Sequence, residues 1–256
     1  MTTLDTRPAV RANGFRPGFL AMELRRTLRN RRTMIFTLVM PPLFFVIFGT
    51  NSGFRHQDYG SGNVTGYVMV SMAVYGAMLA TTSGGAMVAV ERGLGWSRQL
   101  RLTPLRPAVY VATKIMVAMA LGFLSVAVVF VAGAFLGAQL SPTAWVGCFL
   151  IAWLGSLVFA AFGLFMGYLL PAENVMQILG PILALLAFAG GLFMPVSGWF
   201  GTIAKVIPTN GIAVLARAPF AQPSTAGILL ALANVLIWAA IFATGSALMF
   251  RRDTAR

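Results

Sequence analysis

The sequence predicts an all-α membrane protein. Six transmembrane helices are expected, with an amphipathic interface helix before the first and an outer re-entrant segment before the last. Two properties of the whole chain predict this class: 58% of its 256 residues are hydrophobic and only 10% are charged. In a soluble domain of this length roughly a quarter of all residues are charged. The apolar residues also gather in blocks close to the ~20 residues that a helix needs to cross a bilayer. The solvent around the protein is therefore predicted to be lipid.

Six apolar blocks define the expected spans. The first contains Pro41-Pro42, and the fifth is interrupted by Pro181 and by Gly190-Gly191. The six blocks, in chain order, are Thr33–Thr50, Val64–Val90, Ala112–Leu136, Trp145–Leu170, Val175–Met194 and Ile228–Phe250. Two more apolar stretches, Gly198–Ile207 and Gly211–Phe220, are expected to lie against the membrane or dip into it from the outer side.

The basic residues predict the orientation of the chain in the cell (plasma or inner) membrane. Cytoplasmic loops carry an excess of Lys and Arg. With both termini in the cytoplasm, 16 of the 19 Lys and Arg lie inside and three lie outside, which requires an even number of spans. We expect a cytoplasmic leader at residues 1–32, a transmembrane domain at 33–250 and a cytoplasmic tail at 251–256. Because the basic residues lie beside apolar blocks, the net charge of +13 predicts contact with membrane lipid and no nucleic-acid partner.

The leader is expected to contain a helix over Phe15–Arg32. Pro17 suits its first turn, and Leu20, Leu24 and Leu28 form one apolar stripe. Its other faces carry the charged residues, among them Glu23, Arg25, Arg26 and Arg29. Such a helix can lie in the membrane interface. It is either an anchor that only enforces the orientation or a docking surface for a cytoplasmic partner.

The cytoplasmic loop between the second and third expected spans covers residues 91–107. It mixes charged residues with Leu, Trp and Pro. A loop that meets only water would hardly need Trp96, Leu100 and Leu105, so its composition predicts a contact with another protein.

The chain shows no catalytic or cofactor-binding motif. A GxxxxGK[ST] phosphate loop, a Cys/His/acid cluster at metal spacing and a Ser-His-Asp set are all missing from the sequence. The spans hold few of the Asp, Glu or His residues that proton-coupled carriers keep at membrane depth. Glu91 and Lys114 are expected at the cytoplasmic boundary, where their side chains can snorkel to water. We therefore expect no enzyme. A gradient-driven carrier or channel is kept as the alternative function.

Together these features resemble the membrane subunit of ABC-2 type transporters, including the daunorubicin-resistance-like permeases. The likeness rests on five features that follow one another along the chain. They are the basic leader helix, Met40–Phe44 in the first span, the loop segments Glu91-Arg92 and Leu100–Leu105, the turn Leu192–Ser197, and Ile207–Asn210. Gly93 stands where the family has an acidic residue directly after the Glu-Arg pair. Gly198-Trp199-Phe200 replaces the usual Pro-x-Trp.

The resemblance implies half of an exporter. Two permeases, either two copies or a copy and a paralogue, would form the path as a dimer above separate ATPase subunits that bind the ATP and Mg. The leader would be the connecting helix, with Glu23, Arg25, Arg26 and Arg29. The loop would be the coupling helix, with Glu91, Arg92, Arg98, Arg101, Thr103 and Pro104. Spans two and five would meet at the dimer centre and line the path with Met72, Tyr75, Met78, Phe188, Leu192 and Phe193.

The composition of this implied path suggests the cargo. It offers Met, Phe and Tyr but almost no polar group, so the expected cargo is an amphipathic drug-like or lipidic molecule, as in multidrug efflux. Export of a polysaccharide or glycolipid is the alternative within the same family.

Overall fold

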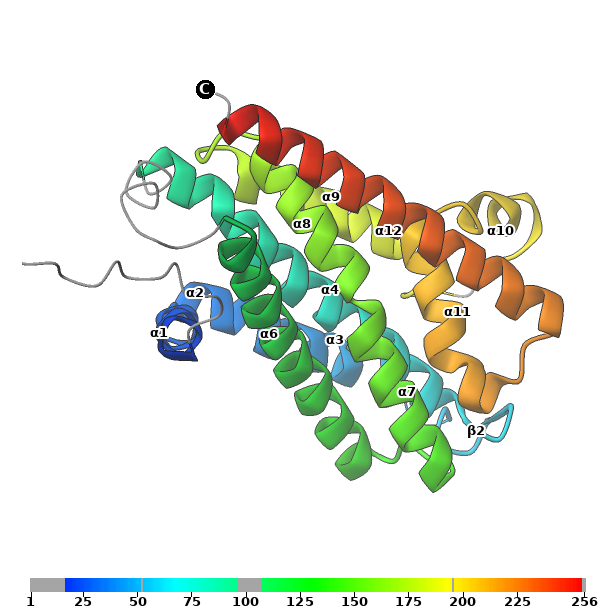
Figure 1. The fold of residues 1–256 in the computed structure, drawn as a ribbon. Coiled ribbons are helices and arrows are strands. Elements are labelled where there is room, and N and C mark those ends of the chain that lie inside the picture. Colours follow the sequence, from blue (N-terminus) through cyan, green and yellow to red (C-terminus); the bar gives the residue numbers. More distant parts are fainter. Residues whose placement is uncertain (1–16, 52, 96–106, 195, 255–256) are drawn as a thin grey trace, which may run out of the picture.

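In the computed structural model the described chain is almost entirely helical (Figure 1). The structure describes residues 17–51, 53–95, 107–194 and 196–254. Two short strands, β1 (Asp58–Tyr59) and β2 (Gly62–Asn63), pair antiparallel just before α4. The helices, in chain order, are α1 (Pro17–Leu28), α2 (Arg31–Met34), the π-helical η1 (Ile35–Val39), α3 (Met40–Gly49), α4 (Val64–Gly93), α6 (Pro107–Leu136), α7 (Pro142–Gly155), α8 (Leu157–Leu169), α9 (Val175–Ala189), α10 (Gly198–Ala204), α11 (Pro208–Ala221) and α12 (Thr225–Thr254).

Four helical segments of the described chain are long and apolar enough to cross a membrane. They are Val64–Gly93, Ala108–Leu136, Pro142–Leu169 and Thr225–Arg252. A fifth follows if α10 and α11, which are bent by 96° at their junction, form one span. Ile35–Gly49 and Val175–Ala189 are apolar but shorter. Length and composition therefore support four to five candidate spans.

Helix α4 is the centre of the bundle, and α12 lies at its edge. In the span of α4, 83% of the residues are buried, against 17% in α12. α4 packs mainly on α6 and α8, where small residues let the backbones approach. A Cβ added to Gly85 would lie 2.6 Å from Ala160 O, and one added to Gly163 would collide with Thr82 O. The Gly163–Gly167 pattern thus serves contacts within one subunit.

The first expected span is continuous helix through Pro41-Pro42. Because proline has no N–H, the carbonyl of Thr37 loses its ordinary partner four residues on. The helix widens to a π-helix at η1, and Ser125 of α6 donates to Thr37 O at 2.7 Å. The Ser125 hydroxyl therefore replaces the missing backbone donor and fixes η1 against α6.

The fifth expected span is shorter than predicted: α9 ends at Ala189 and does not reach Met194. Gly191 has φ +74°, and Leu192 N donates to Ala187 O at 3.0 Å, which is a Schellman-type helix end. The prediction of one helix over Val175–Met194 is therefore wrong at its outer end, because the glycine pair terminates the helix.

The bend between α10 and α11 is held by α12. Carbonyl groups freed at such a bend need donors, above all where water is scarce. Asn234 Nδ2 donates to Lys205 O at 2.8 Å, and Trp238 Nε1 donates to Val206 O at 2.7 Å. The expected apolar segments before the last span therefore form a bent helical pair tied to that span.

Candidate functional site

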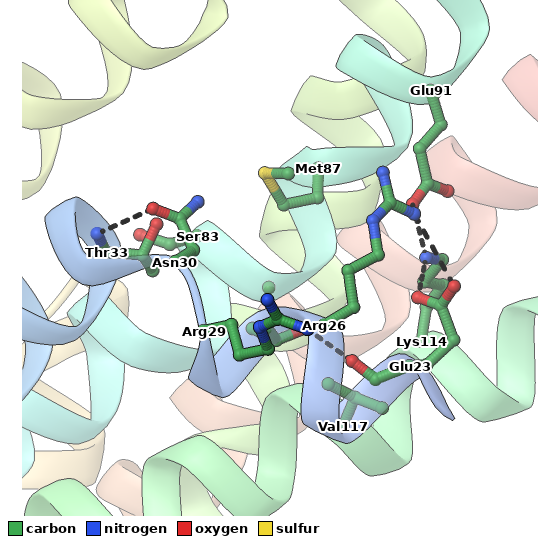
Figure 2. A pocket seen from close by; sticks show the side chains of 12 residues that line it. Glu23, Arg26, Arg29, Asn30, Thr33, Ser83, Met87, Glu91, Lys114 and Val117 are labelled. Carbon is green, nitrogen blue, oxygen red and sulfur yellow. Dashed lines mark hydrogen bonds and ion pairs between the residues drawn. The ribbon is translucent and has the colours of Figure 1, made fainter. Parts of the chain in front are cut away.

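Three charged side chains from distant parts of the sequence meet inside the protein. Glu23 of α1, Glu91 of α4 and Lys114 of α6 are each 3% exposed. Lys114 Nζ donates to Glu23 Oε2 and to Glu91 Oε1, each at 2.5 Å. Figure 2 shows Lys114 between the two carboxylates. We call these residues, together with Arg26 and Tyr110, the charged cluster.

Arg26 and Tyr110 complete the charged cluster. Arg26 Nη1 lies 3.0 Å from Glu91 Oε1 and 3.5 Å from Glu23 Oε1, and its side chain is 48% exposed. The hydroxyl of Tyr110 donates to Glu91 Oε2. A buried carboxylate is costly unless it is paired and hydrogen-bonded. Both carboxylates meet this condition, since two cations and a phenol surround them.

The charged cluster corrects two expectations from the sequence. Glu23 was assigned to the charged outer face of the leader helix, but it is the most buried residue of α1. Glu91 and Lys114 were expected to snorkel to water, but they are buried and paired with each other. The apolar stripe is also incomplete, since Leu28 is 42% exposed. Sequence spacing cannot show that a Glu of α1 and a Lys of α6 neutralise each other.

The other residues expected at the ATPase contact lie in three settings. Glu91 belongs to the last turns of α4 and not to a loop. Arg92 Nη1 donates to Gly167 O at 3.1 Å and to Tyr168 O at 3.0 Å, so it caps the end of α8. Arg25 and Arg29 of the leader are exposed. Arg98, Arg101, Thr103 and Pro104 lie outside the described residues.

Part of the expected path forms an aromatic group. Phe193 stacks on Phe188, with ring centroids 4.4 Å apart, and meets Tyr75 edge-on at 5.1 Å. Phe44 and Phe48 of α3 lie 5.9 and 6.0 Å from Phe193. Phe48 and Phe188 are exposed, so the group reaches the surface of the subunit. We call these five residues the aromatic group; the two from α3 were missed because only spans two and five were considered.

The other three expected path residues lie in the core of the single subunit. Met72 and Met78 are fully buried and Leu192 is 1% exposed. All three belong to the buried hydrophobic core of the bundle. In this structure they offer no surface to a cargo molecule, in contrast to the aromatic group.

Arg217 was expected in an outer segment but is a buried residue of α11. It is 8% exposed, and Nη2 donates to Ser71 Oγ at 2.7 Å and to Gly191 O at 3.0 Å. Its guanidinium carbon lies 4.1 Å from the centre of the Tyr67 ring. Arg217 thus joins α11 to α4 and to the end of α9. A single basic residue inside the apolar stretch Gly211–Phe220 was the available signal.

Comparison with known proteins identifies the family to which this arrangement belongs. The sequence profile described as ABC-2 type transporter matches residues 19–220, which run from α1 to α11. The chain belongs to the ABC-2 type transporter family. This ABC-2 protein is also similar to a protein of Bacillus subtilis (strain 168) that bears the name transport permease YvfS. The two are 31% identical over 176 residues, which are 68% of this chain and 71% of the relative.

Family and structure together define the general class of this ABC-2 protein. It has several helices of membrane-spanning length, it matches the ABC-2 type transporter profile, and its Bacillus subtilis relative carries the name of a transport permease. It is therefore a multi-pass membrane protein and a transporter subunit. The matched region includes every residue of the charged cluster and of the aromatic group.

Proposed function

We propose that this ABC-2 permease is the transmembrane subunit of an ATP-driven exporter whose ATPase is a separate chain. The observation that carries the proposal is the charged cluster, because it joins the leader helix to both ends of the predicted coupling loop. Glu91 lies at the end of α4, where that loop begins, and Tyr110 and Lys114 lie in the first turns of α6, where it ends. Glu23 connects α1 to the same point.

This connection gives a physical route for coupling. A displacement of the predicted coupling loop would reach the ends of α4 and α6, which are held together by Glu91 and Lys114. Since Lys114 also holds α1, the leader helix would move with them. Energy from ATP hydrolysis below the loop would therefore act on one joined unit. In this proposal Glu91 transmits the movement from inside the protein, and the residues that touch the ATPase are on the loop itself, among them Arg98, Arg101, Thr103 and Pro104.

The six-span topology, with both termini in the cytoplasm, belongs to the same proposal. The continuous helix from Arg31 to Gly49 has a length of roughly 28 Å at 1.5 Å per residue, close to the ~30 Å hydrocarbon core. With this helix and α9 counted as spans, α4, α6, the α7–α8 pair and α12 make six. The bent pair α10–α11 is then the re-entrant outer segment. The 16 to 3 distribution of basic residues supports the orientation.

The aromatic group supports an amphipathic drug-like or lipidic cargo carried by a permease dimer. Its exposed members, Phe48 and Phe188, offer apolar surface, and both contact Phe193, which also meets Tyr75, the polar exception among the five rings. Such a surface can adapt to several apolar shapes and has few groups to recognise a sugar. Polysaccharide or glycolipid export is the alternative cargo within this proposal.

A gradient-driven carrier is the second candidate, and one observation favours it. The structure buries Glu91, Lys114 and Arg217, which the sequence did not place inside the protein. Buried ionisable groups in membrane proteins often mark ion or proton pathways. Transport by reconstituted protein that needs a proton gradient and not ATP would establish this candidate.

The test of the main proposal begins with the tagged chain purified from its host membrane in mild detergent. We expect a second protein with a phosphate loop to co-purify and the complex to hydrolyse Mg-ATP. The chain alone should hydrolyse none. Arg98→Glu should reduce the amount of ATPase recovered, whereas Arg55→Glu, a matched change in an outer segment, should not. ATP hydrolysis by the single chain, or equal recovery with Arg98→Glu, would contradict the proposal.

A further inference from the structure

A cavity of about 280 Å³ lies between α1, α4 and α6, next to the charged cluster. Figure 2 shows it lined by the leader helix on one side and by the two core helices on the other. Exposed residues of the leader, Arg29 and Asn30, form part of its wall, so the cavity reaches the surface. Ser83 lines it from α4, two helical turns from Glu91, and the buried Glu23, Glu91 and Lys114 form another part of its wall. The cavity therefore extends from the surface at the leader helix to the buried charged cluster.

The wall of this cavity has unused hydrogen-bond donors. Among the described residues, the guanidinium of Arg29, the side-chain nitrogen of Asn30 and the hydroxyl of Ser83 have no partner. The Nε and Nη2 groups of Arg26 are also free, since its contacts to Glu23 and Glu91 use Nη1 alone. In contrast, Lys114, Arg26 and Tyr110 already engage the two carboxylates in or beside the wall. The cavity therefore offers several donors that no described residue engages, while its two carboxylates are already paired.

Charge and position further restrict the ligand. Arg26, Arg29 and Lys114 line the cavity with Glu23 and Glu91, so the wall has one positive charge in excess. Directly after the lining residue Thr33 the chain turns apolar: Ile35, Phe36 and Val39 are 55%, 56% and 51% exposed. A ligand with an anionic head and an apolar tail fits both the positively charged wall and the exposed apolar residues beside it. A phosphate head suits the wall because guanidinium and hydroxyl groups bind phosphate well.

We propose that this cavity binds the phosphate group of an anionic phospholipid from the leaflet beside α1, with the acyl chains lying along η1. Arg29 and Arg26 would supply charge-assisted hydrogen bonds, and Ser83 would donate from α4. Basic pockets between transmembrane helices are known to take such head groups. The site does not depend on an ATPase partner, so its test is separate from that of the transport function.

The experiment uses the full chain, purified in detergent and stripped of lipid, with phosphatidylglycerol and phosphatidylcholine of identical chains as probes. We expect phosphatidylglycerol to bind, seen by native mass spectrometry and by a rise in Tm, and phosphatidylcholine to bind much more weakly. In the double variant Arg29→Gln/Ser83→Ala the apparent Kd should rise at least about tenfold, since one lost hydrogen bond to a charged group accounts for that factor. The Tm without lipid should not change, because neither side chain has a protein partner among the described residues.

Arg25→Gln is the matched control. Arg25 is exposed on the same helix and does not line the cavity, so its variant should bind phosphatidylglycerol within about twofold of the wild type. Equal weakening by Arg25→Gln would mean that general surface charge attracts the lipid, and the site would be rejected. Glycerol 3-phosphate forms the last arm. If it raises the Tm as much as the lipid does at equal concentration, the site takes soluble phosphate esters and the lipid assignment is wrong.

Discussion

Replacement of Lys114 by Met tests the charged cluster directly. Lys114 lies 2.5 Å from two carboxylates that are 3% exposed, so the variant leaves Glu23 and Glu91 buried with only the half-exposed Arg26 as a cation. Breaking a buried ion pair by removing one partner costs about 3–5 kcal/mol. For a chain of this size such a loss lowers Tm by on the order of 10 °C.

The assay is thermal unfolding of the purified chain in detergent, and the sequence contains its own control. The chain has two lysines, and the second, Lys205, is exposed. Lys205→Met makes the same chemical change without stranding a charge, so its Tm should stay within about 2 °C of the wild type. Adding Glu23→Gln and Glu91→Gln to Lys114→Met should recover much of the loss, because the stranded charges are then gone. A Tm for Lys114→Met equal to that of Lys205→Met would refute the electrostatic account.

Three further predictions follow from the packing. Gly163→Ala should destabilise the chain by about 1–3 kcal/mol, because the added Cβ collides with Thr82 O. The control is Gly180→Ala, whose added Cβ meets no atom within 4 Å and should be tolerated. Unfolding of the two variants in detergent compares their stabilities. Ser125→Ala leaves Thr37 O without its donor and should cost about 1–3 kcal/mol, measured in the same way. Phe193→Ala removes the centre of the aromatic group. It should lower cargo-dependent ATP hydrolysis by the assembled complex at least severalfold and leave the assembly itself unchanged. Normal cargo dependence in this variant would argue against a translocation path at the aromatic group.

The sequence predicted the helical membrane class and most helix positions, because those depend on local properties. The second expected span, Val64–Val90, differs from α4 only at its end. The apolar length of a helix and the charges beside it are properties of about 20 neighbouring residues, so the sequence shows them directly. The end of α9 was missed although Gly190-Gly191 was visible, because an apolar run continues past the glycines to Met194.

The site was harder to predict, because its contacts join distant segments. Glu23, Glu91 and Lys114 were each singled out or noted, but nothing in their spacing shows that they meet. Arg217 shows the same limit: it was placed in an outer segment, and only the fold brings Ser71 and Gly191 O to it. The roles in ATPase docking of the loop residues outside the described part of the chain stay predictions from the resemblance.

The ion pair between Glu23 and Lys114 also determines an order of assembly. The two residues are 91 positions apart, so the ribosome completes α1, the helix from α2 to α3, and α4 before the counter-ion of Glu23 exists. Until α6 is inserted, Glu23 has no buried partner and the leader helix must keep its carboxylate in water. Docking of α1 therefore comes after insertion of α6, and the docked leader marks a chain whose first three apolar segments are already in place.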